Sequence, residues 1–431
     1  MNIAYQTSLP VKYDVDVFVA GGGPAGVAAA VAAARQGASV YLAEYSGAFG
    51  GAGTRALVPA FMQFDDGIHF LAGGIGQEVY DYIQSHVPAA FAEYCPPNIP
   101  VEILKLCYDE MMIGAKVSFE FFTQVTDVIR SGRELTYAIC FGKGERYAVK
   151  AKIFVDCTGD GDMAFHAGAA YVQGDEAGNT MAATLCALWE GINWTNRRLP
   201  DSRRLEQAFQ DSVFTTPDRH LPGMWPISRT TGGSNAGHVY GLDGTCAASL
   251  TKGMLVGRKQ LAEYRRYYRE YLSGFENAEV VISAEQIGVR ETRRILGDYV
   301  LNLEDFLNRA EFEDGIGRYA YPVDIHASDN SEEAHQRFLK EFANLRYEEG
   351  ESYGIPYRSL MVRDFDNLLT AGRCISTDRA MQASVRVMPC CFITGQAAGI
   401  AAAMAAQSYQ SVRAVDVQNL RDRLRQAGVY L

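Results

Sequence analysis

Apolar runs and glycines alternate over the first 44 residues of the chain. The nearly continuous apolar run at residues 15–20 predicts a buried strand, and the Ala-rich stretch at residues 27–35 predicts a helix that ends at Gly37. Residues 38–43 predict a second strand. Between the first strand and the helix stand three glycines in Gly-x-Gly-x-x-Gly spacing, Gly21, Gly23 and Gly26. This order predicts a βαβ unit that binds a dinucleotide, with the phosphates at the helix N-terminus.

Each position of the turn has a physical role in this prediction. Gly21 permits the tight turn, Gly23 lets the backbone approach a pyrophosphate, and Gly26 lets the helix lie against the strand. Glu44 follows the second strand, 18 residues after Gly26, near the ~20-residue offset at which an acid accepts a hydrogen bond from a ribose hydroxyl. A glycine turn alone can be purely structural, but the agreement of both strands, the helix and the terminal acid favours a nucleotide site.

The rest of the pattern mixes helix and strand. Helical spacing of apolar residues covers 101–112, and a β-rich region with two turns covers 117–159. Near the C-terminus, a strand at 367–371 precedes a helix of small residues that begins at Pro389. Residues 171–229 loosen into turns and one charged helix. We therefore expect an α/β protein with a Rossmann-type nucleotide-binding domain, a β-meander insertion and a second, mixed α+β substrate domain.

The amino-acid composition excludes some classes of binding partner and indicates a cell compartment. The chain has 431 residues, 48% of them hydrophobic and 21% charged, which is long enough for two domains with substantial cores. Its net charge of −11 argues against binding to nucleic acid or to an anionic membrane. Nine cysteines without a Cys-x-x-Cys pair predict neither a disulfide framework nor a zinc site. Residues 1–13 lack a signal-peptide core and the Ala-rich stretches are too short to span a bilayer, so we expect a cytoplasmic protein without membrane insertion.

Three polar segments carry candidate chemistry. Asp160 and Asp162 follow a predicted strand, but two carboxylates without a third ligand are more often a turn and a helix cap, so no metal is predicted. The Gly- and Ser-rich loop at 228–246 holds His238, which is either structural or a proton acceptor. Arg290 opens a run of four charged residues that is either a solvated helix or a site that binds a carboxylate or a reduced flavin.

Later motifs resemble one family. They read TGDGDMAFHAGA at 158–169, IGVRETRRILGDY at 287–299, and AGRCIS, RVMPCC and TGQAAG between 371 and 399. In combination they resemble the bacterial FAD-dependent oxidoreductase family, which is similar to glutathione-reductase-like and fumarate-reductase-like flavoproteins. The resemblance runs from about Asp14 to Ala405 and implies FAD as the cofactor. The FAD-binding domain is then expected in three parts, 1–60, 101–175 and 356–431, with a substrate-side excursion at 61–100 and a substrate or cap domain at 176–355.

The resemblance also implies which residues hold FAD. The loop with Gly50, Gly51 and Thr54 would pass the ribityl chain and the flavin, and Val125 would meet the adenine. The helix N-terminus at Val387 and Met388 would face the flavin N1/O2 edge. The full set of implied FAD contacts is Gly21, Gly23, Pro24, Ala25, Gly26, Glu44, Gly50, Gly51, Thr54, Val125, Thr158, Gly159, Gly372, Arg373, Val387 and Met388. Many superfamily members carry Gly-Asp where this chain has Gly372-Arg373.

These expectations combine into a flavin-dependent dehydrogenase or reductase. A hydride would pass between the flavin N5 and a small polar substrate, carboxylated or sugar-like, and an electron acceptor of unknown identity would complete the cycle. Arg290 or Arg386 would orient an anionic group, and His238 would accept a proton. The alternatives are a flavin monooxygenase that uses NAD(P)H and O2, and a flavin-binding interaction protein without catalysis. The sequence does not indicate an oligomeric state.

Overall fold

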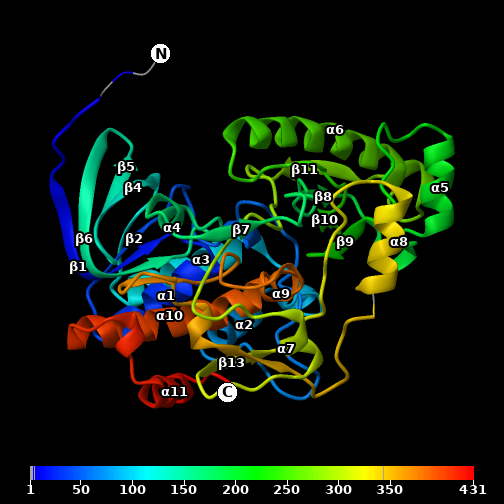
Figure 1. Cartoon of the computed structure of the whole chain (residues 1–431). Coiled ribbons are helices and arrows are strands. Elements are labelled where there is room, and N and C mark those ends of the chain that lie inside the picture. The colour runs from blue at the N-terminus through cyan, green and yellow to red at the C-terminus, as the bar shows by residue number, and fades with distance from the viewer. Residues whose placement is uncertain (1–2, 4, 343) are drawn as a thin grey trace.

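A seven-stranded sheet organises one lobe of the computed structural model, which describes residues 3, 5–342 and 344–431 (Figure 1). The strand order is β3-β2-β1-β6-β5-β4, and β15 also pairs with β6. Five strands run parallel, whereas β4 and β5 form an antiparallel meander with β6. The strands are β1 (Val11–Ala20), β2 (Val40–Ala43), β3 (Ser118–Glu120), β4 (Thr123–Ser131), β5 (Glu134–Gly142), β6 (Glu145–Asp156) and β15 (Leu368–Thr370).

The long strand β6 joins the meander to the parallel part of the sheet. Its residues 145–150 pair with β5, and its last residues, 154–156, pair with β15. β1 lies on its other side, parallel and in register up to the pair Ala20↔Asp156. The carboxyl ends of β1 and β6 are therefore adjacent, and Cys157 N donates to Ala20 O over 2.8 Å. In open parallel sheets, ligands bind outside this edge.

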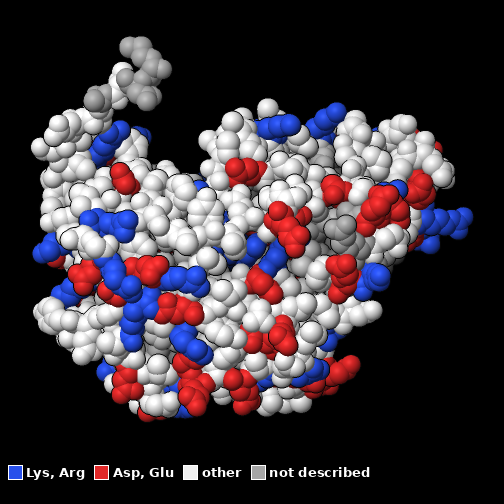
Figure 2. Space-filling model, in the orientation of Figure 1, with Lys and Arg blue, Asp and Glu red and all other residues white. Residues whose placement is uncertain are grey.

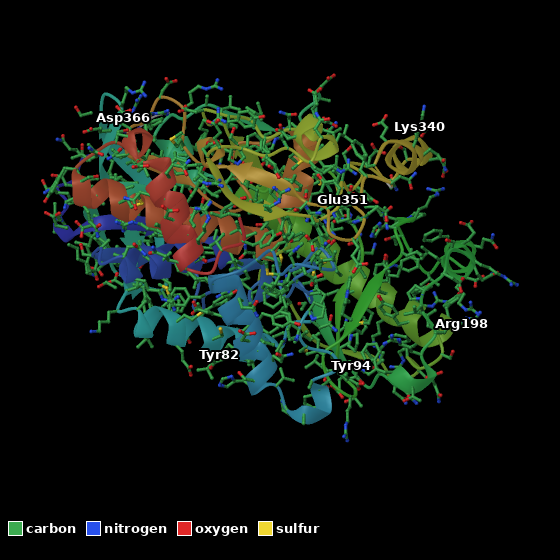
Figure 3. The ribbon with its side chains drawn as sticks, turned by 90° about the horizontal axis from the view of Figure 1, so that it is seen from below. Tyr82, Tyr94, Arg198, Lys340, Glu351 and Asp366 are labelled. Carbon is green, nitrogen blue, oxygen red and sulfur yellow. The ribbon has the colours of Figure 1, made fainter. Side chains whose placement is uncertain are left out.

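Two glycine- and alanine-rich helices pack side by side below this sheet. They are α1 (Pro24–Arg35) and α10 (Met388–Ser408), seen from below in Figure 3. The contact needs glycine, because a Cβ at Gly395 would lie 2.2 Å from Ala25 O and one at Gly399 would lie 2.1 Å from Ala29 O. α10 has the length and apolar composition of a membrane span, but its apolar window is entirely buried in the protein. The apolar composition of α10 is therefore explained by its place in the hydrophobic core of the protein.

The second lobe is built on a four-stranded antiparallel sheet in the order β11-β8-β10-β9. Figure 1 shows α6 (Ala247–Tyr271) lying along this sheet. Tyr264, Tyr267 and Tyr268 of α6 are buried, and Tyr268 meets the ring of Trp189 at 5.3 Å. The strands are β8 (Ala187–Glu190), β9 (Gly223–Pro226), β10 (Gly232–Asn235) and β11 (Glu279–Ser283). An amphipathic helix thus covers the four-stranded sheet, and its buried tyrosines belong to the same hydrophobic core as α1 and α10.

Shorter elements lie around and between the lobes. The two remaining strand pairs are β7 (Tyr171–Gln173) with β12 (Arg293–Ile295), and β13 (Gly315–Tyr319) with β14 (Tyr353–Pro356). The other α-helices are α2 (Ile75–His86), α3 (Val101–Gly114), α4 (Asp162–His166), α5 (Ser202–Gln210), α7 (Leu303–Leu307), α8 (Glu332–Glu341), α9 (Arg379–Val385) and α11 (Val417–Gln426). α8 is peripheral, as the place of Lys340 in Figure 3 shows. Acidic and basic side chains are interspersed on the face in Figure 2. Ion pairs between such side chains include Arg413–Asp298.

The predicted fold class is confirmed: the protein is α/β, with a Rossmann-type sheet, a β-meander insertion and a second mixed lobe. The seven-stranded sheet draws its strands from the three parts expected to bind FAD, and the four-stranded sheet lies within 176–355. The exact segment boundaries stay predictions.

Candidate functional site

The glycine turn between β1 and α1 leaves room for a ligand at one position. Gly21 has φ +91°, and a Cβ at Gly26 would lie 1.8 Å from Gly21 O, so both positions need glycine for the fold itself. At Gly23, by contrast, no atom of the described residues lies within 4 Å of the place a Cβ would occupy. Among these residues no side chain caps the N-terminus of α1, which starts with Pro24 and Ala25. Its first N–H groups are therefore available to an anion.

Glu44 is fixed beside this turn. Its Oε2 accepts from Gly22 N at 2.7 Å and its Oε1 from Ser46 N at 2.8 Å, and the residue is 5% exposed. Thr123 N, at the start of β4, donates to Glu44 O over 2.9 Å. Val125, two residues further along β4, is buried close to the same carboxyl edge. The ribose contact of Glu44 and the adenine contact of Val125 stay predictions.

The loop after β2 meets both the glycine turn and α10. Gly50 N donates to Gly22 O at 2.8 Å, and a Cβ at Gly51 would lie 3.5 Å from Gly23 Cα. A Cβ at Gly53 would lie 3.0 Å from Met388 Sδ, so the loop touches the first turn of α10.

Two further predicted contacts lie at these junctions. Within residues 3, 5–342 and 344–431, no side chain caps α10 at Val387. The Thr54 hydroxyl donates to Phe49 O at 2.6 Å. This hydroxyl therefore stabilises the loop itself, and its contact with FAD stays a prediction.

The turn after β6 is held by a buried carboxyl. Asp156 accepts from Thr158 N at 3.0 Å, from Thr158 Oγ1 at 2.7 Å and from Ala164 N at 2.8 Å. Burial raises the pKa of Asp156 to about 6, although these hydrogen bonds oppose the rise. Gly159 has φ +78°, which favours glycine at the bend. Asp156 thus fixes the backbone at Thr158 and Gly159 that is expected to approach the cofactor.

Arg373, which replaces the common aspartate, ties this turn to the second lobe. Its Nε donates to Gly159 O at 3.0 Å, its Nη2 contacts Asp160 Oδ1 at 2.5 Å, and its Nη1 donates to Val289 O. Gly372, with φ +84°, lies against α1, since a Cβ there would be 2.9 Å from Ala25 Cβ. The side chain of Arg373 is therefore engaged by protein groups, and its contact with the ribityl chain stays a prediction.

A chain of polar side chains connects the start of α10 to the second lobe. Arg386 donates from Nη2 to Asp324 Oδ2 at 2.9 Å, and Asp324 Oδ2 lies 3.4 Å from His326 Nε2. His326 Nδ1 lies 2.9 Å from His238 Nε2, and His238 Nδ1 lies 3.2 Å from Asp218 Oδ1. Both ring nitrogens of His238 and both of His326 face a polar atom, so these two rings have a fixed orientation. The structure thus places the predicted residues Arg386 and His238 in one cluster.

Arg290, the third predicted residue, is buried beside this chain. Its Nη1 donates to Ala182 O at 2.7 Å and to Thr184 Oγ1 at 2.9 Å, and its Nη2 donates to Asn235 Oδ1 at 3.2 Å. All three partners are uncharged. Burial and the nearby charge of Arg386 lower the pKa of Arg290 to about 10, which leaves it a cation at neutral pH. Among the described residues, Arg386 Nε also has no hydrogen-bond partner.

A small cavity and a third histidine complete the cluster. The ring of His220 lies 4.9 Å from that of His238 and 5.0 Å from that of His326, measured between centroids. These residues, with Tyr240 and Asp324, line a cavity of about 40 Å³. Burial and the charge of Arg290 lower the pKa of His326 well below its usual range, so this ring is neutral at pH 7. The cavity has room for at least one water molecule.

The other charges in the run after Arg290 stabilise the fold. Glu291 is fully buried, accepts from Met181 N at 3.0 Å, and pairs with Arg294 and with Arg379 at 3.2 Å. Arg293 pairs with Asp162 at 2.8 Å. The segment contains strand β12 and its charges are buried, so the solvated-helix alternative is wrong.

Four residues of the cluster were not predicted from the sequence: Asp218, His220, Asp324 and His326. Both pairs have Asp-x-His spacing in segments without helical or strand periodicity. That spacing is the one signal the sequence offers for them. Their proximity is set by tertiary contacts between segments about a hundred residues apart.

Three comparisons relate the chain to known proteins. A family model described as FAD dependent oxidoreductase matches residues 16–424. A search of curated proteins gives no match. A geranylgeranyl bacteriochlorophyll reductase-like protein from Thermoplasma acidophilum is 10% identical, with a TM-score of 0.46 over 97% of this chain and 84% of that chain. The flavin-dependent brominase Bmp2 is 16% identical, with a TM-score of 0.44 over 96% and 83%. The flavin-dependent halogenase CmlS is 15% identical, with a TM-score of 0.45 over 96% and 62%. These similarities are too distant to bear on the reaction.

Proposed function

Because this chain belongs to the FAD dependent oxidoreductase family, we propose that it is a dehydrogenase or reductase for a small anionic substrate. Family membership makes it an oxidoreductase with FAD as its cofactor. The proposal adds hydride transfer as the reaction and a carboxylated compound or sugar acid as the substrate class. It also adds a separate electron acceptor.

The residues at the glycine turn fit FAD. The open space at Gly23 and the uncapped N-terminus of α1 suit a pyrophosphate, and Glu44 is held by two backbone N–H groups where an acid is expected to meet a ribose. When bound, FAD supplies the flavin N5 that takes up or releases a hydride. Val387 and Met388 would face the flavin from the uncapped start of α10.

The observation that carries the proposal is the buried charge of Arg290. Its side chain is 7% exposed, and its hydrogen bonds go to three neutral groups. A buried cation that lacks a carboxylate partner is costly, and an anionic oxygen from a substrate would remove that cost. The unpartnered Nε of Arg386, one residue before Val387, offers a second donor next to the expected flavin position. Two guanidinium groups would thus orient a carboxylate beside the cofactor.

The experiment is an anaerobic screen of the FAD-loaded protein. Hydroxy acids, sugar acids, unsaturated acids and their uncharged counterparts are mixed with it while the absorbance of oxidised flavin is followed. We expect at least one anion to reduce the flavin, or to reoxidise it after chemical reduction, and its uncharged counterpart to fail. Equal rates with charged and uncharged forms would remove the role proposed for Arg290.

Repeating the screen in air with NAD(P)H present separates the alternatives. A monooxygenase would then consume NAD(P)H and O2 together with substrate, and an interaction protein would hold FAD without any substrate-dependent change in absorbance under either condition. Sedimentation of the holoprotein gives the oligomeric state. The nine free cysteines support a reducing, cytoplasmic setting.

A further inference from the structure

Three histidines meet at the cavity with the dimensions of a metal tripod. Among residues 3, 5–342 and 344–431, the ligand nitrogens of His220, His238 and His326 lie within 4.8 Å of one another. The three ring centroids are separated by 4.9, 5.0 and 5.0 Å, a nearly equilateral triangle. Imidazole nitrogens bind Zn²⁺ at about 2.0–2.1 Å, so three rings around a tetrahedral ion have centroids roughly 5 Å apart. The observed triangle matches this value.

In two of the three rings, one nitrogen contacts a carboxylate. Asp218 Oδ1 lies 3.2 Å from His238 Nδ1, and Asp324 Oδ2 lies 3.4 Å from His326 Nε2. The remaining nitrogens of these rings, His238 Nε2 and His326 Nδ1, face each other at 2.9 Å. Metal-ligating histidines characteristically place the second ring nitrogen on a carboxylate, which sets the tautomer and strengthens the ligand. Two rings of this cluster have that arrangement.

We propose that His220, His238 and His326 bind one divalent transition-metal ion, with zinc the expected occupant, and leave a fourth position open toward the cavity. Imidazole ligands suit zinc, and three protein ligands with one open position are typical of catalytic zinc sites. The two facing nitrogens, 2.9 Å apart, need to separate only to about 3.3 Å to share a tetrahedral ion. The cavity of about 40 Å³ holds the fourth ligand, a water or a substrate oxygen.

The surrounding charges suggest what that fourth ligand is. Asp324 pairs with Arg386, whereas Arg290 donates its hydrogen bonds to neutral groups, so the ion adds positive charge near an already cationic side chain, and an anionic oxygen would neutralise that charge. A metal ion lowers the pKa of a hydroxyl that it binds. In the loaded protein His238 is then a ligand rather than the proton acceptor, and a substrate hydroxyl bound to the ion would give its proton to a water molecule. This last step rests on the proposed function, whereas metal binding itself does not.

The test uses the full-length, FAD-loaded protein, stripped with a chelator and titrated with Zn²⁺ in the absence of substrate. Metal content is measured by mass spectrometry, and affinity by competition with a chelating dye. We expect one zinc per chain. His220→Ala should weaken binding at least about 100-fold, because one of three ligands is lost. His220 is exposed, so this variant should keep its fold and its FAD. The matched control is His86→Ala, which replaces an exposed histidine on α2 and should bind zinc with the affinity of the wild type.

Two further variants test a second ligand and the carboxylate that contacts it. His326→Ala should bind zinc as poorly as His220→Ala does, and Asp324→Asn should weaken binding about 10–100-fold through the ring that it supports. If His326→Ala loses its FAD, the zinc affinity of His220→Ala, in which the replaced histidine is exposed, is used by itself to test the proposal. Zinc affinity in His220→Ala equal to that of the wild type, or a wild type that takes up no zinc, would overturn the proposal. Because no substrate is present, either result leaves the proposed function standing.

Discussion

The substitution Gly23→Ala should lower the affinity for FAD without lowering the stability of the folded protein. The methyl group would enter a space with no atom within 4 Å, and Gly23 has φ −70°, which alanine adopts freely. We therefore expect the cofactor-free variant to be as stable as the wild type, or more stable by about 0.4–1 kcal/mol, because alanine restricts the unfolded chain. Gly26→Ala should instead destabilise the protein, since its Cβ would lie 1.8 Å from Gly21 O.

The loss of FAD affinity follows from the blocked approach. Displacing the pyrophosphate by the width of a methyl group would cost at least one hydrogen bond to a charged group, about 1.5–3 kcal/mol. This energy corresponds to a rise of roughly 10–150-fold in the Kd for FAD.

The assay is fluorescence titration of the cofactor-free protein with FAD, combined with thermal unfolding followed by circular dichroism. Gly114→Ala, whose Cβ on α3 also meets nothing within 4 Å, is the matched control: it should gain a similar stability of about 0.4–1 kcal/mol and leave the Kd for FAD unchanged. A wild-type Kd in Gly23→Ala would refute the reasoning, because the open space would then not be the pyrophosphate position.

Two further predictions concern stability and pH. Gly399→Ala should lower the free energy of unfolding by about 1–3 kcal/mol or more, because α1 and α10 must separate; a Tm equal to that of the wild type would contradict the packing described here. Folding raises the pKa of Asp156 from 3.8 to about 6, so its contribution to stability is complete below pH about 4 and is lost as the pH rises through about 6. Asp156→Asn should therefore gain stability relative to the wild type between pH 4 and 8, by at most about 3 kcal/mol in urea titrations of the FAD-loaded proteins, and a constant difference would argue against a raised pKa.

The parts of the fold that the sequence predicted correctly depend on local physics. The strand, the glycine turn and the helix that follow Val11 are encoded within 25 consecutive residues, because positive φ at Gly21 and close contact at Gly26 leave glycine as the residue that fits. The helix after Pro389 was predictable for the same reason, since its small residues match its close packing on α1. The charged run after Arg290 was ambiguous, because a buried ion network and a solvated helix use the same residue types.

The polar cluster was only partly predictable. His238, Arg290 and Arg386 stood out as polar side chains near glycine-rich or family-like motifs, but Asp218 and His326 lie in segments without periodicity. The backbone at Ala182 and Ala183 bonds to Ala327 and Val239, and His238 and His326 lie within 2.9 Å of each other although they are 88 positions apart in the sequence. Contacts at such sequence separation leave no local pattern. Arg373 likewise needed the structure, which shows it joining the turn after β6 to the second lobe.

The central claim is that the buried charge of Arg290 binds the anionic group of the substrate, and Arg290→Met tests it most directly. The apolar side chain removes the buried charge but leaves Ala182 O, Thr184 Oγ1 and Asn235 Oδ1 without the donor that Arg290 provides, so stability should fall by about 1–3 kcal/mol while the protein stays folded. Loss of a hydrogen bond to a charged group should lower kcat/KM for the anionic substrate by about 1.5–3 kcal/mol, roughly 10–150-fold, with FAD content unchanged. The measurement is the rate of flavin reduction by that substrate in anaerobic stopped flow, for the wild type and Arg290→Met side by side. A reduced rate in a folded, FAD-replete variant is the expected result, and equal rates in the two proteins would contradict the claim.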